Sequence, residues 1–200
     1  MNYKIKRLDY EEISFIYRNY LVCDFPQDEV KPLSNIEKMY QTETYMAYGF
    51  FFDQEGVGKT LAGYAFCSKY LDGTMLLLDY FAILKQFRSQ GIGGDFLAAL
   101  KNELSDIKGI LIETEDIAYA SNEKEKQIRE RRDAFYERNG VQKVSIHSCV
   151  FDVHYQIWQL PIKEAMDSQT CFLELKEIYK NMVPEELYIK NVNITYDSKF

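Results

Sequence analysis

The sequence predicts a single α/β domain, covering residues 1–200, built on a mixed β-sheet. Segments of strand length and amphipathic segments of helix length alternate along the whole chain. Hydrophobic residues make up 46% of the 200 residues, which is enough for a substantial core. Three glycines in four residues, Gly91-Ile92-Gly93-Gly94, mark one junction between a strand and a helix. These observations favour an enzyme-like α/β fold with a ligand site at that junction.

The N-terminal part of the chain predicts one strand, two helices and a hairpin. Asp9 and Glu12 have the spacing of a capping box, and Ser34 and Glu37 repeat it, so each pair is expected to begin a helix. The predicted elements are a strand at 3–8, helices at 9–21 and 34–40, and strands at 45–52 and 61–71.

The stretch from Leu76 to Gly94 is the most informative part of the sequence. An apolar run of strand length ends near Ile83, and an amphipathic helix follows the glycines and runs to about Ser105. Glycines at a helix entrance let backbone N–H groups crowd together and point at a ligand, where the helix dipole favours negative charge. The stretch therefore predicts an anion site, most simply for a phosphate or pyrophosphate.

The C-terminal half predicts further strands and helices. Asn122 and Glu125 are spaced as a helix cap and its partner, Glu125 and Arg129 are spaced as an i,i+4 ion pair, and Gly140 is a suitable stop. The predicted elements are a strand at 109–113, a helix at 122–138, strands at 141–151 and 155–160, a helix at 163–182, and a short strand at 188–194. Residues 161–200 are expected to form a mainly helical extension.

Composition excludes several functional classes. The formal net charge of -7 argues against a general nucleic-acid binder and slightly favours cationic substrates. The four cysteines are scattered without metal or disulfide spacing. The first residues lack the apolar core of a signal peptide, and no apolar run is long enough to span a bilayer. We therefore expect a cytoplasmic, reduced protein without a membrane partner.

Two motifs resemble known functional sites but lack residues or spacing that those sites require. Gly58-Lys59-Thr60 resembles the end of a P-loop, but Asp53 stands where that motif requires glycine, and a strand follows instead of a helix. A second cluster, formed by His147, Cys149, Asp152 and His154, fits no zinc spacing well. No metal is expected.

Two short stretches give the chain a family resemblance. Arg88-Ser89-Gln90-Gly91-Ile92-Gly93 fits the Arg/Gln-x-x-Gly-x-Gly/Ala signature at a strand-to-helix junction, and Phe135-Tyr136-Glu137-Arg138-Asn139-Gly140 looks like a later helix ending in Phe-Tyr-x-x-x-Gly. In this order, with a strand-forming segment between them, they resemble the GCN5-related N-acetyltransferase (GNAT) superfamily. The resemblance covers roughly Tyr3 to Leu160.

The resemblance implies a fold and a set of site residues. The sheet is expected to be mixed but mostly antiparallel, with helices on both faces and a splayed central strand pair. Acetyl-CoA is the implied cosubstrate, with its pantetheine arm bonded to the backbone near Phe81 and Ile83. Tyr136 matches the tyrosine that protonates the departing thiolate. The residues implied to bind the pyrophosphate are Arg88, Ser89, Gln90, Gly91, Ile92, Gly93 and Gly94. The sequence departs from the family pattern at Arg129, where many members carry an asparagine.

Acyl transfer to an amine also needs a base, because an alkylammonium has no free electron pair. Glu113, at the end of a strand, is the first choice, and Asp79, in the central strand, is the second. Glu115 and Asp116 follow as residues that could bind a cation or simply end a strand. Cys67 or Cys149 could instead carry the acyl group, although the sequence implies no histidine or acidic partner for either thiol.

The sequence thus predicts an acetyl-CoA-dependent N-acetyltransferase that transfers the acetyl group directly to a primary amine. The acceptor is a small molecule or a protein, and a monomer or homodimer is expected. The alternative is a non-catalytic module of the same fold that binds acyl-CoA as a sensor or interaction partner.

Overall fold

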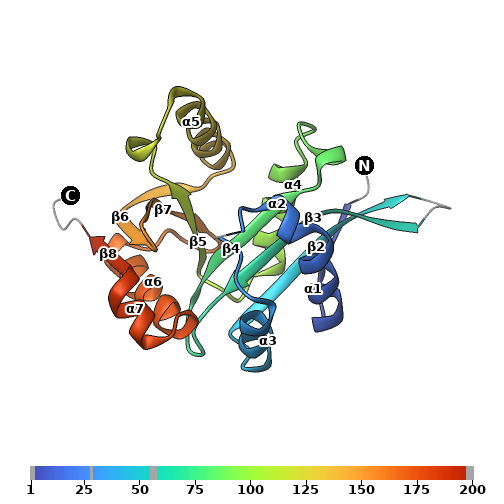
Figure 1. Cartoon of the computed structure of the whole chain (residues 1–200). Coiled ribbons are helices and arrows are strands. Elements are labelled where there is room, and N and C mark those ends of the chain that lie inside the picture. Colours follow the sequence, from blue (N-terminus) through green and yellow to red (C-terminus); the bar gives the residue numbers. More distant parts are fainter. Residues whose placement is uncertain (1–2, 28, 55–57, 197–200) are drawn as a thin grey trace. The chain divides into compact units, whose positions relative to one another are not determined.

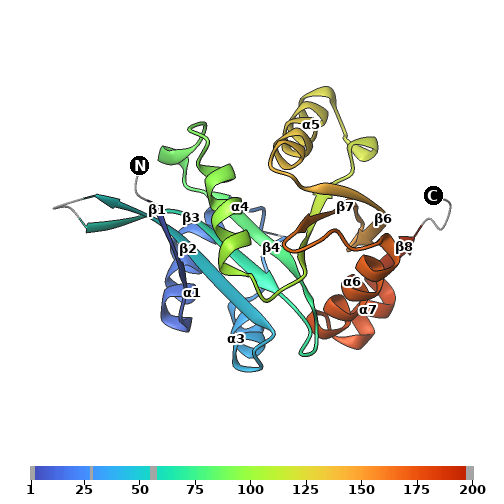
Figure 2. The same ribbon diagram turned by 180° about the vertical axis from the view of Figure 1, so that it is seen from behind.

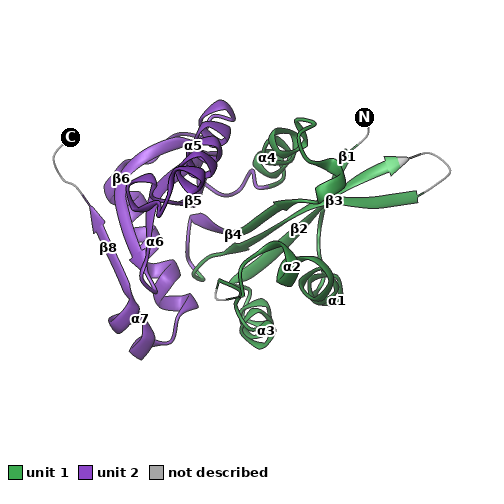
Figure 3. Cartoon of the chain, turned by 45° about the horizontal axis from the view of Figure 1, so that its top comes forward, with its two compact units in different colours: residues 1–71, 79–103 green, residues 72–78, 104–200 purple. Residues whose placement is uncertain are grey.

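The computed structural model describes residues 3–27, 29–54 and 58–196, which form two compact units (Figure 3). Unit 1 contains residues 1–71 and 79–103, and unit 2 contains residues 72–78 and 104–200. The strands are hydrogen-bonded in the order β1-β2-β3-β4-β5-β7-β6-β8. Strand β4 (Met75–Ile83) contributes its first four residues to unit 2 and the remainder to unit 1.

Unit 1 is a sheet with helices on both faces. Figures 1 and 2 show α1 and α3 on one face of β1, β2 and β3 and α4 on the other. Helix α4 packs through Phe96, whose ring stacks on Phe50 at 4.7 Å and lies 5.2 Å from Phe81. The elements are β1 (Tyr3–Arg7), α1 (Tyr10–Ile16), a π-helical turn (Tyr17–Leu21), α2 (Val22–Asp24), α3 (Leu33–Gln41), β2 (Tyr45–Gln54), β3 (Gly58–Ser68), a 3-10 turn (Lys85–Phe87) and α4 (Ile92–Glu103).

The predicted helix caps and strand ends of unit 1 agree with the structure only in part. Asp9 and Glu12 form the predicted capping box at α1. The capping box predicted at Ser34 is wrong, because α3 begins at Leu33 directly after Pro32, whose φ of -55° leads the chain into the helix one residue earlier. The hairpin is tighter than predicted, with its strands paired as far as Gln54 and Gly58. The rest of the predicted loop lies partly outside the described residues.

Unit 2 also carries helices on both faces of its strands. Side chains of successive strand residues point to opposite faces. In β5, the Glu113 carboxylate accepts a hydrogen bond from Tyr179 of α6. Burial raises the pKa of Asp133 on α5, and a hydrogen bond with Thr114, the next residue of β5, partly offsets this effect. The elements are β5 (Gly109–Glu115), a 3-10 turn (Ile117–Tyr119), α5 (Glu123–Arg138), β6 (Gln142–Val150), β7 (Val153–Pro161), α6 (Ser168–Met182), α7 (Glu185–Asn191) and β8 (Val192–Tyr196).

The C-terminal residues differ from the prediction of a short strand at 188–194. The segment begins as helix α7, and the strand β8 starts only at Val192 and pairs antiparallel with β6. Three predicted features of α5 are confirmed: Asn122 caps it, Glu125 pairs with Arg129, and Gly140, with φ +78°, follows its last turn.

Pairing in the sheet is mostly antiparallel, as predicted, with a parallel pair between β4 and β5. That parallel pairing joins Met75–Leu78 to Gly109–Ile112, within unit 2. A divergence of the two strands beyond this stretch stays a prediction. Among the described residues, no helix is both long and apolar enough to cross a membrane.

Candidate functional site

The turn between β4 and α4 in unit 1 is shaped by backbone conformations with positive φ. Ser89 has φ +61° and Gly91 has φ +81°, and α4 begins at Ile92. Such angles are costly for most residues, whereas glycine adopts them freely. A Cβ atom built on Gly91 would meet nothing within 4 Å. The turn is therefore open at Gly91, with space for a ligand against the backbone.

The backbone N–H groups of this turn are available for an anion. The backbone N–H groups of Ser89 to Gly93 donate to no residue that the structure describes. The N–H groups of Gly94 and Asp95 both donate to the Gly91 carbonyl. The first N–H groups of a helix have no partner within the helix, and the dipole makes this end partly positive. The turn therefore has the geometry that an anion site requires, and the anion site itself stays a prediction.

Arg88 lies at the entrance of the turn and is tied to unit 1 at two points. Its Nε donates to the Ile83 carbonyl at 2.6 Å, and its Nη2 lies 3.0 Å from Asp24 Oδ1. The side chain is half exposed. These contacts fix the exit of β4 relative to the turn, and they occupy one acceptor position of the Ile83 carbonyl.

Close approach of β3 and β4 requires a glycine beside the predicted pantetheine strand. A Cβ atom on Gly63 would lie 2.7 Å from the Ala82 carbonyl oxygen and 2.8 Å from Ile83 Cδ1. The backbone at Leu84 also donates to Ala62 in β3. Gly63 thus allows the end of β4, including Phe81 and Ile83, to lie tightly against β3.

Asp79, one of the two predicted bases, is almost fully buried in unit 1, with 7% of its side chain exposed. Lys31 Nζ lies 2.5 Å from its Oδ1, and the Tyr45 hydroxyl donates to its Oδ2. Burial, and then the charge of Asp79, hold the pKa of Tyr45 well above its ordinary value. Tyr45 therefore stays protonated and keeps donating to this carboxylate.

Glu113, the other predicted base, lies in unit 2 between two hydroxyl donors. The Tyr179 hydroxyl donates to Oε2 at 2.6 Å, and Ser148 Oγ donates to Oε1 at 3.1 Å. Both donors are neutral, in contrast to the ammonium of Lys31 beside Asp79.

Tyr136 lies on α5 and is buried, with its ring edge-to-face against Phe135 at 5.2 Å. Burial raises the pKa of Tyr136 to about 12, an effect that the charge of Arg132 partly offsets. Its hydroxyl makes no hydrogen bond with a residue in the described ranges. The phenol is thus protonated at neutral pH and free to donate to a ligand.

Arg129, which departs from the family pattern, links α5 to the end of β5 in unit 2. It donates to the Asp116 carbonyl at 2.5 Å and to Glu115 at 3.0 Å, and it also pairs with Glu125 one turn earlier on α5. Arg132 bonds the second oxygen of Glu115 at 3.1 Å. Glu115 is therefore committed to arginines of α5 rather than open to a cationic substrate.

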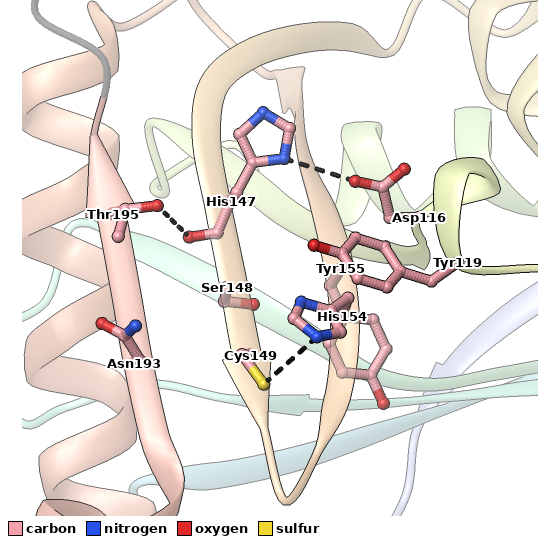
Figure 4. A pocket seen from close by; sticks show the side chains of 9 residues that line it. All are labelled: Asp116, Tyr119, His147, Ser148, Cys149, His154, Tyr155, Asn193 and Thr195. Atoms are coloured by element: carbon pink, nitrogen blue, oxygen red, sulfur yellow. Dashed lines mark hydrogen bonds and ion pairs between the residues drawn. The ribbon is translucent and has the colours of Figure 1, made fainter.

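A separate cavity of about 240 Å³ lies in unit 2, beside β6, β7 and β8 (Figure 4). The Cys149 thiol faces His154 Nε2 at 3.9 Å, and the His154 ring stacks on Tyr119 at 3.7 Å. His147 lies 3.5 Å from Asp116. The expectation that Cys149 has no histidine nearby is therefore wrong, since the two-residue turn between β6 and β7 places His154 opposite it.

Cys67 is excluded as an acyl carrier by its surroundings. It is fully buried in β3, and burial raises the pKa of its thiol far above the ordinary value. Among the described residues, no group of three or more His, Cys, Asp or Glu side chains is arranged to hold a metal ion.

Comparison with known proteins identifies the fold. No family model and no curated protein matches the sequence. Solved structures do match. One is the ribosomal-protein-S18-alanine N-acetyltransferase from Escherichia coli, with 21% identity over 82% of this chain and 97% of that chain and a TM-score of 0.55. Another is an acetyltransferase of the GNAT family from Staphylococcus aureus, with 20% identity over 81% and 100% of the two chains and a TM-score of 0.51.

A third similar structure contains mutant forms of the spermidine/spermine N-acetyltransferase from Vibrio cholerae. It is 10% identical over 80% of this chain and 95% of that chain, with a TM-score of 0.55. Each comparison covers most of both chains. The chain therefore has the fold of the GNAT acetyltransferases.

Proposed function

We propose that this protein is an acetyl-CoA-dependent N-acetyltransferase that acetylates a primary amine of a small molecule or a protein. The observation that carries the proposal is the turn from Ser89 to Gly93. Its backbone N–H groups are unpaired within the described chain and stand at the entrance of α4, on a GNAT fold. We further propose that residues 1–200 form one acetyltransferase domain, cytoplasmic and either monomeric or homodimeric, with 161–200 as its C-terminal extension.

The turn and the end of β4 would bind the donor. The N–H groups of this turn suit a pyrophosphate, and Arg88 adds a positive charge beside them. Peptide groups at Phe81 and Ile83 would bond the amide-bearing arm. Acetyl-CoA supplies an acetyl group activated as a thioester. The full set of proposed cofactor-binding residues is Phe81, Ile83, Arg88, Ser89, Gln90, Gly91, Ile92, Gly93 and Gly94.

The acceptor amine must lose a proton before it attacks, and we propose Glu113 as the base. Ser148 and Tyr179 each donate a hydroxyl hydrogen bond to its carboxylate, and each hydroxyl is able to relay a proton. Asp79 is the alternative base. The Lys31 ammonium lies 2.5 Å from its Oδ1, so an acceptor amine would have to displace Lys31 to reach that oxygen.

Tyr136 would serve as the acid that protonates the departing thiolate. Its hydroxyl has no described partner, and its pKa of about 12 keeps it protonated throughout the neutral range. The transfer is uphill toward a thiolate of ordinary pKa, about 8.5. We therefore expect Tyr136 to act by hydrogen bonding early in the step and to release its proton as the C–S bond breaks.

The nature of the acceptor is left open between two classes. One similar structure is named for an alanine of a ribosomal protein and another for spermidine and spermine, so the fold accommodates protein amines and polyamines. The net charge of -7 favours an acceptor that is itself cationic.

A panel of amines tests this function. Purified protein with acetyl-CoA is incubated with polyamines, amino acids, aminoglycosides and peptides, and the free thiol of CoA is measured. We expect release that depends on at least one amine. Saturable binding of acetyl-CoA without release for any amine would instead establish the non-catalytic sensor.

A further inference from the structure

The side chain of Lys31 fills a small polar site in unit 1 that is lined by acid and aromatic groups. Its Nζ lies 2.5 Å from Asp79 Oδ1 and 5.2 Å from the centre of the Tyr80 ring. The Lys31 side chain is 25% exposed and the Asp79 side chain 7% exposed. A lysine ammonium is thus held largely out of water by one carboxylate and one aromatic face.

The carboxylate of this site requires a cation. A buried carboxylate that lacks a positive partner is strongly destabilising. The Tyr45 hydroxyl donates to Oδ2, and among the described residues it is Lys31 that brings a positive charge to Oδ1. An ammonium with N–H donors suits both Oδ1 and the electron-rich ring of Tyr80. The site is therefore chemically selective for a primary ammonium group.

Lys31 belongs to a connecting segment, not to a helix or strand. It lies between α2, which ends at Asp24, and α3, which begins at Leu33. Several contacts hold the described part of this segment. The Tyr17 hydroxyl donates to the Lys31 carbonyl, and the Lys31 N–H donates to the Tyr80 hydroxyl. That hydroxyl donates to the Glu29 carbonyl, and the Phe25 ring lies edge-to-face on Tyr80.

These contacts are individually weak. Each of the three hydrogen bonds measures 2.9 Å, and such a bond contributes on the order of 1 kcal/mol. Tyr17 itself opens a π-helical turn, Tyr17–Leu21, a type of helix that is rare and often found at functional positions. None of these three hydrogen bonds involves the Lys31 ammonium, so the side chain can leave Asp79 while they persist.

We propose that Asp79 and Tyr80 form a binding site for a primary alkylammonium group, which Lys31 fills in the free protein and the acceptor amine fills in its place. This inference rests on the proposed function, and it narrows the acceptor to a primary ammonium on a flexible alkyl chain. Lys31 then acts as an internal competitor that weakens binding of every acceptor. Asp79 becomes available to take a proton only from the amine that has displaced Lys31.

Chemical rescue tests the site without any acetyl transfer. In Lys31→Ala, n-butylammonium chloride replaces the missing side chain and its charge. We expect the melting temperature of this variant to rise saturably with n-butylammonium, and not with tetramethylammonium or sodium chloride at equal ionic strength. Lys38→Ala, which removes an exposed lysine of α3, is the matched control and should not respond. An equal rise in both variants, or none in Lys31→Ala, overturns the proposal.

A second measurement uses the unaltered protein, in case Lys31→Ala does not fold. Acetic anhydride labels free lysine amines, and mass spectrometry gives the ratio of labelling at Lys31 to that at Lys38. n-Butylammonium should raise this ratio relative to sodium chloride, because it displaces Lys31 from Asp79. An unchanged ratio overturns the proposal.

Kinetics separate this proposal from the proposed function. Removing the competitor should lower KM for a cationic amine in Lys31→Ala by about tenfold, since the apparent affinity scales with the fraction of open sites. If n-butylammonium stabilises Lys31→Ala but no amine releases CoA, the ammonium site is supported and the acetyltransferase function is contradicted. If amines release CoA but Lys31→Ala is not stabilised by n-butylammonium and has an unchanged KM, the acetyltransferase function is supported and the ammonium site is contradicted.

Discussion

Tyr136 is the residue whose proposed role makes the clearest kinetic prediction. Tyr136→Phe removes the hydroxyl and keeps the buried ring, so the fold and acetyl-CoA affinity should persist while kcat falls by roughly 100-fold. Because burial raises the pKa of Tyr136 to about 12, the phenol stays protonated up to about pH 10, and any fall in activity below that pH belongs to another group. The alkaline limb should therefore be the same in both proteins. Steady-state kinetics across pH check this, and an unchanged kcat would remove Tyr136 as the acid.

Arg129 shows why a departure from the family pattern can be structural. It is buried, and its guanidinium is bonded to Glu115, Glu125 and the Asp116 carbonyl. Arg129→Met should lower the free energy of unfolding by roughly 3 kcal/mol, because Glu125 loses its cation, Glu115 keeps only Arg132, and the Asp116 carbonyl loses its donor. Urea titration measures the loss. Arg138→Ala, at an exposed position of the same helix, should cost far less, and equal losses would contradict this account.

The four cysteines should differ sharply in their reaction with iodoacetamide. Burial raises the pKa of Cys171 to about 12 and that of Cys67 still further, so both thiols stay protonated and shielded. Cys23 is exposed and Cys149 is half-buried, so these two should react in the folded protein. Peptide mass spectrometry after brief labelling gives the order. Labelling of Cys67 before Cys149 would show that the core of unit 1 opens readily.

Side-chain neighbours were the least predictable part of the site. The sequence predicted Asp79 and Glu113 as carboxylates on strands, but it offered no signal for Lys31 or Tyr179, which lie 48 and 66 positions away along the chain. The pairing of Cys149 with His154 had a signal that was available: two residues that flank a tight turn face each other across a hairpin.

The turn that leads into α4 is the element on which donor binding depends. Gly91→Asp would place a carboxylate beside the proposed pyrophosphate position, and we expect acetyl-CoA affinity to fall at least about tenfold through charge repulsion. Gly140→Asp is a matched control, because Gly140 has φ +78°, close to the +81° of Gly91, and a Cβ atom there also meets nothing within 4 Å.

Isothermal titration calorimetry of the two aspartate variants gives the comparison. Because backbone strain is nearly equal in the two variants, any loss of stability that it causes is common to both and does not affect the comparison of their acetyl-CoA affinities. Equal affinities for acetyl-CoA would exclude this turn as the pyrophosphate site.

Elements with strong local signals were predicted best. The glycine turn, the cap at Asn122 and the stop at Gly140 follow from backbone chemistry within a few residues, and the structure confirms the cap and the stop. The ends of elements that depend on tertiary pairing were missed, as in the strand that begins at Val192 only where β6 offers it a partner.

At the scale of the whole molecule, the chain forms two compact units that share β4, and the single domain expected from the sequence stays a prediction. The periodicity of apolar residues indicates which residues are buried, but not which compact unit they belong to. The division into two units therefore could not be predicted from the sequence. The proposed donor residues lie in unit 1, and Glu113 and Tyr136 lie in unit 2.

Ligand binding gives a prediction for the intact chain. A ligand that binds only the folded state stabilises it by about 2.7 kcal/mol at a concentration of 100 times its Kd. Acetyl-CoA at saturating concentration should therefore raise the melting temperature, and desulfo-CoA, which keeps the pyrophosphate, should do so nearly as well. Stabilisation by neither compound would contradict the donor site.

The central claim is that an acetyl group leaves CoA and arrives on an amine, and its most direct measurement follows that group. Acetyl-CoA labelled with deuterium in the acetyl methyl group is incubated with the protein and the best amine of the panel, and the products are identified by mass spectrometry. The account predicts labelled N-acetyl amine and free CoA in equal amounts. Intact labelled acetyl-CoA on the protein, or labelled acetate in place of the acetylated amine, would contradict it.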